Sequence, residues 1–304
     1  MSTFTSLKNY LRDSRYCIGF IKDYNVFDKF DYKKIHWLDL NGYKDGWFAD
    51  PFIFESNEQK FTVLAEEWYY PINHGRISKL TIDRKSFELL EVKPLLQLET
   101  HLSFPLIVRE NGTVYICPEN YQSGAVSIYE YDVEADRLTN PVKLIDKPLL
   151  DVQILNNNGV YYLMGVEYVT GEQIDTCKLQ IFTSEHLLGP YEQRQVITSD
   201  HCDKRGAGLI FRYNDKVIRP SQCCDNNEYG TAVIFNEITF EGEIFAEKEN
   251  QRITRCKRKH NGMVLHSFNQ LDGLTAIDGW DYTHRYIGRF VEYLRKNIRK
   301  FINS

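Results

Sequence analysis

Residues 47–54 read WFADPFIF, an apolar run typical of a buried strand that contains one carboxylate, Asp50. Four later stretches open in a similar way, with polar residues followed by an apolar run: HLSFPLIVRE from His101, LLDVQILNN from Leu149, RGAGLIFRY from Arg205 and NGMVLHSFN from Asn261. The five starts lie 54, 48, 56 and 56 residues apart. This recurrence is close to the spacing of propeller blades and indicates a repeat architecture.

Each opening strand is followed by a polar turn and a second strand, and four of the five units also show a third alternating strand. The fifth unit lacks outer strands, whereas residues 33–40 (KKIHWLDL) form a strand-like stretch with no unit of its own. If an N-terminal strand joins the sheet of the last blade, the ring closes and no sheet edge is left open. We therefore predict an all-β fold, a five-bladed β-propeller over residues 33–280, with two stacked β-sandwiches as the alternative.

The two ends of the chain are predicted to be short helices. Residues 1–32 are interpreted as a helical extension, and residues 281–304 as a basic amphipathic helix with apolar residues at helical spacing. Either this C-terminal helix packs on the side of the propeller, or it is an interfacial helix that contacts anionic lipid.

Composition narrows the class of protein. The chain has 304 residues and a formal net charge of -5, which gives no electrostatic case for nucleic-acid binding. Its first twenty residues have no apolar core of signal-peptide length, so we expect a cytoplasmic protein, with peripheral contact at the inner face of the membrane under the interfacial interpretation. Seven scattered cysteines include no C-x-x-C pair, and no nucleotide-binding motif is present, so we expect neither a cofactor nor a metal site.

Polar residues recur near the starts of the predicted inner strands. In a propeller these strands line the central channel, so such residues meet at one mouth. Each can have a purely structural role, but several ionisable groups at one place are costly to bury unless a ligand or mutual pairing compensates. The candidates are Asp50, His101, Ser103, Asp151, Arg205 and His266.

Further polar side chains lie on the second strands and in the loops after them, interleaved with aromatic residues. Aromatic rings beside carboxylates, arginines and amides are typical of a sugar-binding surface, although aromatic residues in strands are also ordinary core residues. The polar set is Glu66, Glu67, Glu119, Glu167, Arg219 and Gln222, and the aromatic set is Trp68, Tyr69, Tyr70, Tyr121, Tyr168 and Tyr229.

The ADPF stretch that opens the first unit resembles glycoside hydrolase family 43. The resemblance implies that Asp50 is a general base and that Asp151 tunes the catalytic acid. In that family a glutamate general acid opens the fourth blade, where this chain has RGAG with Arg205. An arginine cannot donate a proton to a leaving oxygen near neutral pH, but it can bind a phosphate or carboxylate.

A longer series of motifs is similar to the propeller domain at the N-terminus of glucosamine inositolphosphorylceramide transferases and to its stand-alone bacterial relatives. The motifs keep their order between residues 46 and 279: WFADPF, HGRIS, HLSFP, PEN, RGAG, RPSQ, YG and DG. In the plant members of this family, glycosyl transfer is assigned to a separate domain.

Together these features predict a carbohydrate-active enzyme that transfers a glycosyl group in surface-polysaccharide or glycolipid assembly. Asp50 is the expected base, Asp151 and Glu67 are expected to orient or tune it, and the ligand is a sugar or sugar nucleotide. The expected ligand-binding residues are His101, Ser103, Arg205, Arg219, Gln222, Tyr229 and His266, with the two arginines holding an anionic group. The alternatives are a glycoside hydrolase that recruits its acid from another blade and a non-catalytic glycan-binding propeller.

Overall fold

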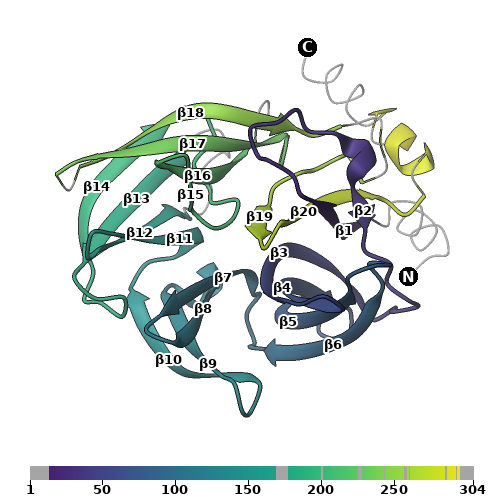
Figure 1. Cartoon of the computed structure of the whole chain (residues 1–304), viewed down its shortest axis with the longest axis horizontal. Coiled ribbons are helices and arrows are strands. Elements are labelled where there is room, and N and C mark those ends of the chain that lie inside the picture. Colours follow the sequence, from purple (N-terminus) through teal and green to yellow (C-terminus); the bar gives the residue numbers. More distant parts are fainter. Residues whose placement is uncertain are drawn as a thin grey trace.

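A computed structural model describes residues 14–168, 177–199, 201–224, 228–242, 244–256, 259, 261–284, 286–291 and 293–294. Its strands form five antiparallel sheets of four strands each, arranged as a ring (Figure 1). The predicted five-bladed β-propeller is therefore confirmed, and the alternative of two stacked sandwiches is wrong. Each sheet is one blade, and its first strand in the order given below is the inner one.

The first four blades follow the chain, and each is a meander of four consecutive strands. Blade 1 consists of β3 (Gly46–Ser56), β4 (Lys60–Tyr69), β5 (His74–Asp83) and β6 (Leu89–Leu96). Blade 2 consists of β7 (Ser103–Glu110), β8 (Thr113–Glu119), β9 (Val126–Asp132) and β10 (Arg137–Ile145). Blade 3 consists of β11 (Leu149–Asn157), β12 (Val160–Glu167), β13 (Cys177–Ser184) and β14 (Glu192–Ser199). Blade 4 consists of β15 (Phe211–Tyr213), β16 (Lys216–Cys223), β17 (Ala232–Glu241) and β18 (Ile244–Thr254).

Blade 5 joins the two ends of the chain. Its order is β19 (Phe268–Leu271), β20 (Leu274–Tyr282), β1 (Ser14–Lys22) and β2 (His36–Trp37). The N-terminal segment thus closes the ring, but most of the closure comes from β1, which pairs with β20 over its full length. Residues 14–22, which we expected in a helical extension, are instead a strand. The side chains of Ile18 and Phe20 are fully buried, which explains why this segment joins the sheet.

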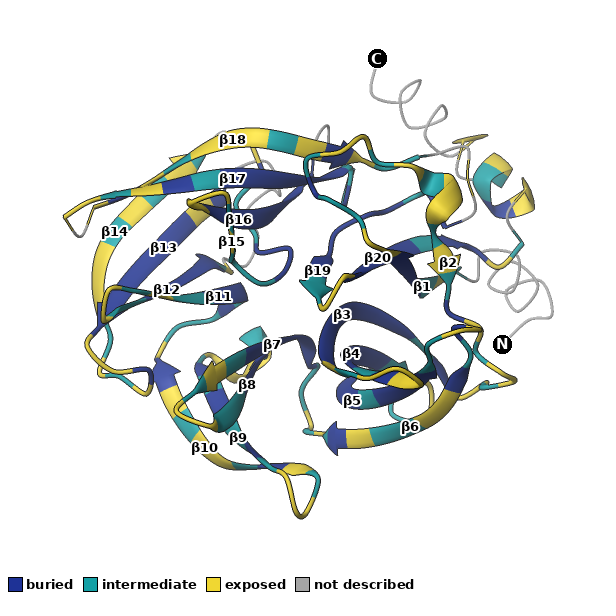
Figure 2. Ribbon diagram, viewed as in Figure 1, coloured by how far each residue is buried: buried dark blue, intermediate teal, exposed yellow. Residues whose placement is uncertain are grey.

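Apolar packing between neighbouring sheets holds the blades together. Figure 2 shows that inner and middle strands are mostly buried and that exposed residues gather on outer strands such as β18, β14 and β10. Aromatic side chains meet edge to face across three blade interfaces, with ring centroids about 5 Å apart. These pairs are Phe52 with Phe104 at 4.9 Å, Phe235 with Phe268 at 4.8 Å, and Phe20 with Phe61 at 4.9 Å.

Among the residues that the structure describes, helical structure is confined to short segments. Two 3-10 turns cover Tyr32–Lys34 and Tyr121–Ser123, and residues 286–291 and 293–294 are α-helical. The α-helix lies against blade 5, where Arg289 pairs with Asp281 at 2.6 Å and a side chain at Gly288 would collide with the Tyr282 ring. Residues 23–31 of the predicted N-terminal extension are not helical, and residues 281–284 of the predicted C-terminal helix are strand and turn. Residues 1–13 and 295–304 lie outside the described residues.

Candidate active site

A cavity of about 580 Å³ lies at the end of the ring where the inner strands begin. Seven of the residues predicted to be catalytic or ligand-binding line it: Asp50, His101, Ser103, Asp151, Arg205, Tyr229 and His266. Six of them come from the region where an inner strand starts or from the loop before it, and Tyr229 comes from the loop between the second and third strands of blade 4. Convergence of the blades therefore brings together residues that are more than two hundred positions apart in the chain.

A backbone bulge recurs near the start of three inner strands, and in blades 1 and 3 its central residue is an aspartate that lines the cavity. In blades 1, 2 and 3 the pairing of the inner strand with its neighbour shifts register near the strand start. The residue inside each shift has a positive φ: 48° at Asp50, 43° at Phe104 and 45° at Asp151. Aspartate tolerates this left-handed conformation better than most residues, and bulges re-aim side chains near active sites. The bulge explains how a carboxylate fits in an apolar strand.

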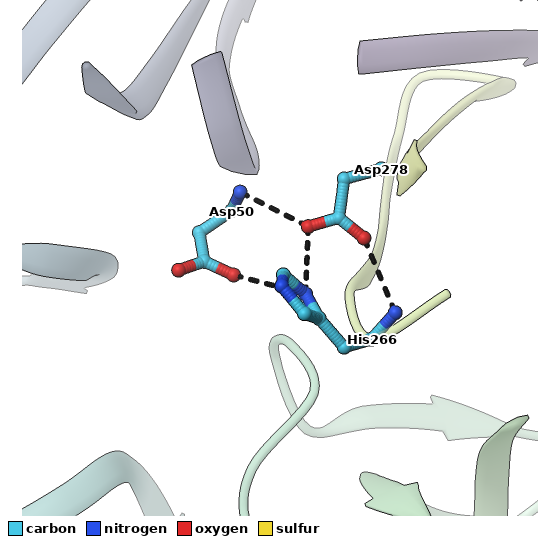
Figure 3. Close-up of side chains that lie close together, drawn as sticks. All are labelled: Asp50, His266 and Asp278. Carbon is cyan, nitrogen blue, oxygen red and sulfur yellow. Dashed lines mark hydrogen bonds and ion pairs between the residues drawn. The ribbon is translucent and has the colours of Figure 1, made fainter. Parts of the chain in front are cut away.

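Asp50 forms a buried cluster with two residues of blade 5, shown in Figure 3. The Nδ1 atom of His266 lies 2.7 Å from Oδ2 of Asp278 and 3.4 Å from Oδ1 of Asp50. Asp278 also accepts hydrogen bonds from the backbone amides of Asp50, His266 and Ser267. The cluster fixes the inner strand of blade 1 to the last blade.

The electrostatics of this cluster set the protonation states of its members. Burial raises the pKa of Asp50 to about 7, although the nearby His266 opposes the shift. Burial alone would lower the pKa of His266, but Asp278 and Asp50 outweigh it and raise that pKa to about 9. The imidazole is thus positively charged at neutral pH, whereas Asp278, stabilised by His266 and by backbone amides, has a lowered pKa and is ionised.

The same three side chains lie close enough together to hold a metal ion, with one ligand atom from each within 4.8 Å of the others. A metal ligand must be a neutral imidazole, so an ion bound here would displace the proton that the two carboxyl groups favour on His266. As the three side chains lie, they form an ion-pair network.

A second polar group lies across the cavity, at blades 2 to 4. Arg205 donates from Nε to Oδ2 of Asp151 at 2.6 Å, and its Nη2 lies 3.8 Å from Oε2 of Glu119. Gln222 donates to the same Asp151 oxygen at 2.8 Å. Asp151 in turn donates its backbone amide to Glu119 at 3.1 Å. Because Arg205 is engaged by two carboxylates, it neutralises this side of the pocket instead of presenting an unpaired cation to a ligand.

Two glycines allow these close approaches. A side chain at Gly206 would lie 2.3 Å from the carbonyl oxygen of Asp151, so the RGAG stretch needs glycine next to Arg205. A side chain at Gly75 would lie 2.4 Å from the carbonyl oxygen of Leu102. The Gly75 amide instead donates to Nδ1 of His101 at 2.9 Å and fixes that ring at the cavity wall.

Aromatic side chains form much of the remaining wall. Trp47 and Trp68 stack with ring centroids 5.4 Å apart, and Tyr16 lies 5.1 Å from Trp47. On another side Tyr121 and Tyr168 are in contact, with ring centroids 4.5 Å apart. All five of these aromatic residues line the cavity. Aromatic faces beside carboxyl groups suit a ligand that has both C-H faces and hydroxyl groups.

Three predicted site residues do not line the cavity. Glu67 is fully buried within blade 1, where it accepts hydrogen bonds from Arg76, Ser78 and Tyr43. Because β4 alternates its side chains, Glu67 points to the other face from its neighbour Glu66, which does line the cavity.

Arg219 is also fully buried, and it binds Glu247 through Nε at 2.7 Å and Nη2 at 2.9 Å. The ligand-binding role expected of Arg219 is therefore wrong, and so is the tuning role expected of Glu67. Gln222 is buried behind Asp151 and positions that carboxylate, so it does not contact a ligand from the cavity wall.

Several cavity residues were absent from the predicted site. Glu66 and Glu119 were noted only as polar residues of second strands, and Tyr16 and Trp47 were not considered as site residues. Asp278, which is buried behind Asp50 and His266, was not considered either. The pairing of the second strand with the inner strand could have identified Glu66 and Glu119 as cavity residues. Glu66 lies opposite Ala49 and Glu119 opposite Ser103, and each of these partners directly precedes a bulge residue. An acid at this place on a second strand points towards the cavity.

Residues 37–274 match the family model described as "Glucosamine inositolphosphorylceramide transferase 1, N-terminal". The protein of that name from Oryza sativa subsp. japonica is 24% identical over 248 residues, which is 80% of this chain. Its counterpart from Arabidopsis thaliana is 25% identical over 245 residues, or 75% of this chain. This chain spans only 31% of the length of either relative.

The fold is shared with glycoside hydrolases. The crystal structure of a thermostable family-43 glycoside hydrolase superimposes with a TM-score of 0.54 at 16% sequence identity. The match covers 73% of this chain and 83% of that one. The resemblance to the N-terminal domain of glucosamine inositolphosphorylceramide transferases is thus confirmed. The resemblance to glycoside hydrolase family 43 is confirmed at the level of the fold.

Proposed function

We propose that this chain, which belongs to the family of the N-terminal domain of glucosamine inositolphosphorylceramide transferase 1, is a carbohydrate-active enzyme. Its reaction is the transfer of a glycosyl group onto a glycan, or another modification of a glycan, in surface-polysaccharide or glycolipid biosynthesis. The ligand of the cavity is a sugar or sugar nucleotide.

One observation carries the proposal: Asp50 is held at the wall of an aromatic-lined cavity with a pKa of about 7. A carboxylate with this pKa can accept a proton near neutral pH, which is the requirement for a general base. Asp50 then removes the proton from an acceptor hydroxyl as that oxygen attacks the sugar. His266 and Asp278 hold its orientation, and the imidazolium stabilises its ionised form.

The rest of the cavity provides binding. His101, Ser103 and Tyr229 lie where they can contact sugar hydroxyls, and Trp47 with Trp68 offers an aromatic face for a ring. Asp151 is held by Arg205 and Gln222, so its position is fixed before a ligand arrives.

Hydrolysis is the second candidate, and a specific observation favours it. The cavity contains Glu66 and Glu119 besides the two aspartates, and Asp50 acts electrostatically on Glu66. A carboxyl pair across a sugar is the usual equipment for glycoside hydrolysis, with water in place of the acceptor hydroxyl.

The test is a screen of the purified protein for product formation by mass spectrometry. Sugar nucleotides and oligosaccharides are supplied as donors, with and without oligosaccharide acceptors. We expect a product that forms only when an acceptor is present. Asp50→Asn should abolish its formation, and Asp146→Asn, which changes an exposed carboxyl group, should leave it unchanged. Donor cleavage without acceptor would establish hydrolysis instead. If the protein binds a sugar but converts none of the donors, only the glycan-binding alternative remains.

A membrane-proximal location is part of the proposal. Helical residues Tyr286, Phe290 and Tyr293 are 83%, 59% and 65% exposed, and Ile287 and Leu294 are also exposed. Apolar side chains on a helix of a basic segment suit insertion between anionic lipid headgroups at the inner face of a membrane. No helix among the described residues is long and apolar enough to cross a bilayer.

A further inference from the structure

Glu66 lies beside Asp50 in the cavity but differs from the other carboxyl groups there. It is on β4, opposite Ala49, and its side chain is 9% exposed. Its carboxyl makes no hydrogen bond to another described residue: Nε2 of His101 lies 3.6 Å from Oε1, which is too long for a hydrogen bond, and Asp50 acts on it only electrostatically. A buried carboxyl that faces a cavity without a partner is free to bind or protonate a ligand.

The neighbouring acids are all engaged. Asp278 accepts three backbone amides and pairs with His266. Asp151 accepts from Arg205 and Gln222. Glu119 accepts the backbone amide of Asp151 and lies near the Arg205 guanidinium. The hydrogen bonds and the ion pair of Asp278 favour its charged form, whereas burial and the nearby Asp151 raise the pKa of Glu119 well above its ordinary value although Arg205 opposes the shift. Within the described part of the chain, the carboxyl of Glu66 accepts no hydrogen bond of this kind.

His101 does not supply the missing positive charge. Its Nδ1 accepts a hydrogen bond from the Gly75 amide, so in the neutral ring the proton is on Nε2, the atom that faces Glu66. Burial lowers the pKa of His101 to about 4, with a further contribution from His74, so the ring is neutral above that pH.

The charges around Glu66 also oppose its ionisation. Burial is the largest cause and raises its pKa well above the ordinary value. Asp50, Asp278 and Asp151 add to this rise, and the His266 imidazolium opposes it. Two carboxyl groups in one cavity therefore have different protonation states, which is the arrangement that assigns acid and base in carbohydrate enzymes.

From this geometry we propose that Glu66 is the proton donor to the leaving-group oxygen, in the place of the glutamate that Arg205 replaces at the start of blade 4. The inference rests on the proposed function. As the bond between the anomeric carbon and the leaving oxygen breaks, Glu66 gives its proton to that oxygen. The acceptor oxygen forms the new bond to the same carbon and gives its proton to Asp50. Exchange with solvent then returns both carboxyl groups to their starting forms.

This assignment narrows the donor class. A nucleoside diphosphate leaves without a proton, whereas an alcohol leaving group needs one. A cavity with a dedicated proton donor therefore fits a glycoside, such as an oligosaccharide or a glycosylated lipid, better than a sugar nucleotide.

The first experiment needs no substrate. Infrared spectra of protein labelled with ¹³C at the glutamate side-chain carboxyl groups report protonated glutamates separately from Asp50. At neutral pH we expect the carbonyl stretch of a protonated carboxyl in the unmodified protein. Glu66→Gln should weaken that band, with the remainder coming from Glu119, whose pKa is also raised by burial, and Glu192→Gln, which changes an exposed carboxyl, should leave the band unchanged. A spectrum without the band, or a band that Glu66→Gln leaves unchanged, overturns the proposal.

The second experiment separates proton donation from structure. Glu66→Gln should lose about 10²- to 10⁴-fold in turnover of oligosaccharide donors. On dinitrophenyl glycosides and glycosyl fluorides, whose leaving groups need no proton, it should stay within about tenfold of the unmodified protein. Equal losses on both donor types would show that Glu66 is not the proton donor while the proposed function stands. If the unmodified protein processes no sugar at all, the proposed function fails, and the catalytic role of Glu66 fails with it.

Discussion

Asp278 accepts a hydrogen bond at 3.2 Å from the backbone amide of Asp50, although the two residues are 228 positions apart in the chain. The contact joins the second strand of blade 5 to the inner strand of blade 1 and therefore lies where the ring closes. It also positions the carboxylate that we assign as the base. Closure of the fold and organisation of the site thus depend on the same side chain.

Asp278→Asn is expected to destabilise the protein by about 3 kcal/mol, because it leaves the buried His266 imidazolium without its nearer counter-ion. Urea unfolding measures the change. The control is Asp146→Asn, whose carboxyl is 80% exposed and which should change stability by less than about 0.5 kcal/mol. Equal effects of the two variants would show that the imidazolium does not depend on Asp278.

Stability should fall as the pH rises towards 9. The pKa of His266 rises from an ordinary 6.5 to about 9 in the folded protein. Its stabilising contribution is therefore complete below 6.5 and is lost as the pH passes through 9, a change of about 3 kcal/mol. Asp50, with a pKa raised to about 7, acts in the same direction at lower pH because folding favours its protonated form.

Urea unfolding at several pH values between these limits tests this dependence. In His266→Gln the loss of stability between neutral pH and pH 9 should disappear, since no imidazolium remains to titrate. A variant that keeps the full slope would assign the dependence to other groups.

Glu67→Gln should impair stability and leave ligand binding intact. The variant breaks a buried ion pair with Arg76, at a cost of about 3 kcal/mol. Calorimetric titration with a sugar found in the screen should give an unchanged dissociation constant for the folded protein. Asp50→Asn provides the opposite pattern, with turnover lost and the fold retained. A change in affinity caused by Glu67→Gln would mean that this residue acts on the cavity after all.

Replacing the exposed apolar residues of the C-terminal helix should weaken membrane binding. For Ile287→Ser combined with Phe290→Ser we expect at least about tenfold weaker co-sedimentation with phosphatidylglycerol vesicles. Unfolding should be unchanged because both side chains are exposed. Leu90→Ser, which changes an exposed apolar residue on β6, serves as the control. Binding that is unaffected by the double variant would favour a helix that only packs on the propeller.

The sequence alone was sufficient for the architecture and for part of the site. The starts of the inner strands repeat at a nearly constant interval, and each repeat corresponds to one blade, so the number of blades follows from this spacing. The same spacing predicts that Asp50, Asp151 and Arg205 converge at one end of the ring. The positive φ of Asp50 and of Asp151 is also a local feature, since aspartate tolerates that conformation at a bulge better than most residues.

Only the tertiary structure decided which polar side chains face the cavity and which are engaged in buried ion pairs. Glu66 and Glu67 are neighbours in the chain, yet one lines the cavity and the other is locked to Arg76. Arg219 is neutralised by Glu247, and Asp278 belongs to the site through a contact with blade 1. Strand β1 was missed for a related reason, because its partner β20 lies at the other end of the chain. Pairing energies depend on distances between residues remote in sequence, and the folded ring alone sets those distances.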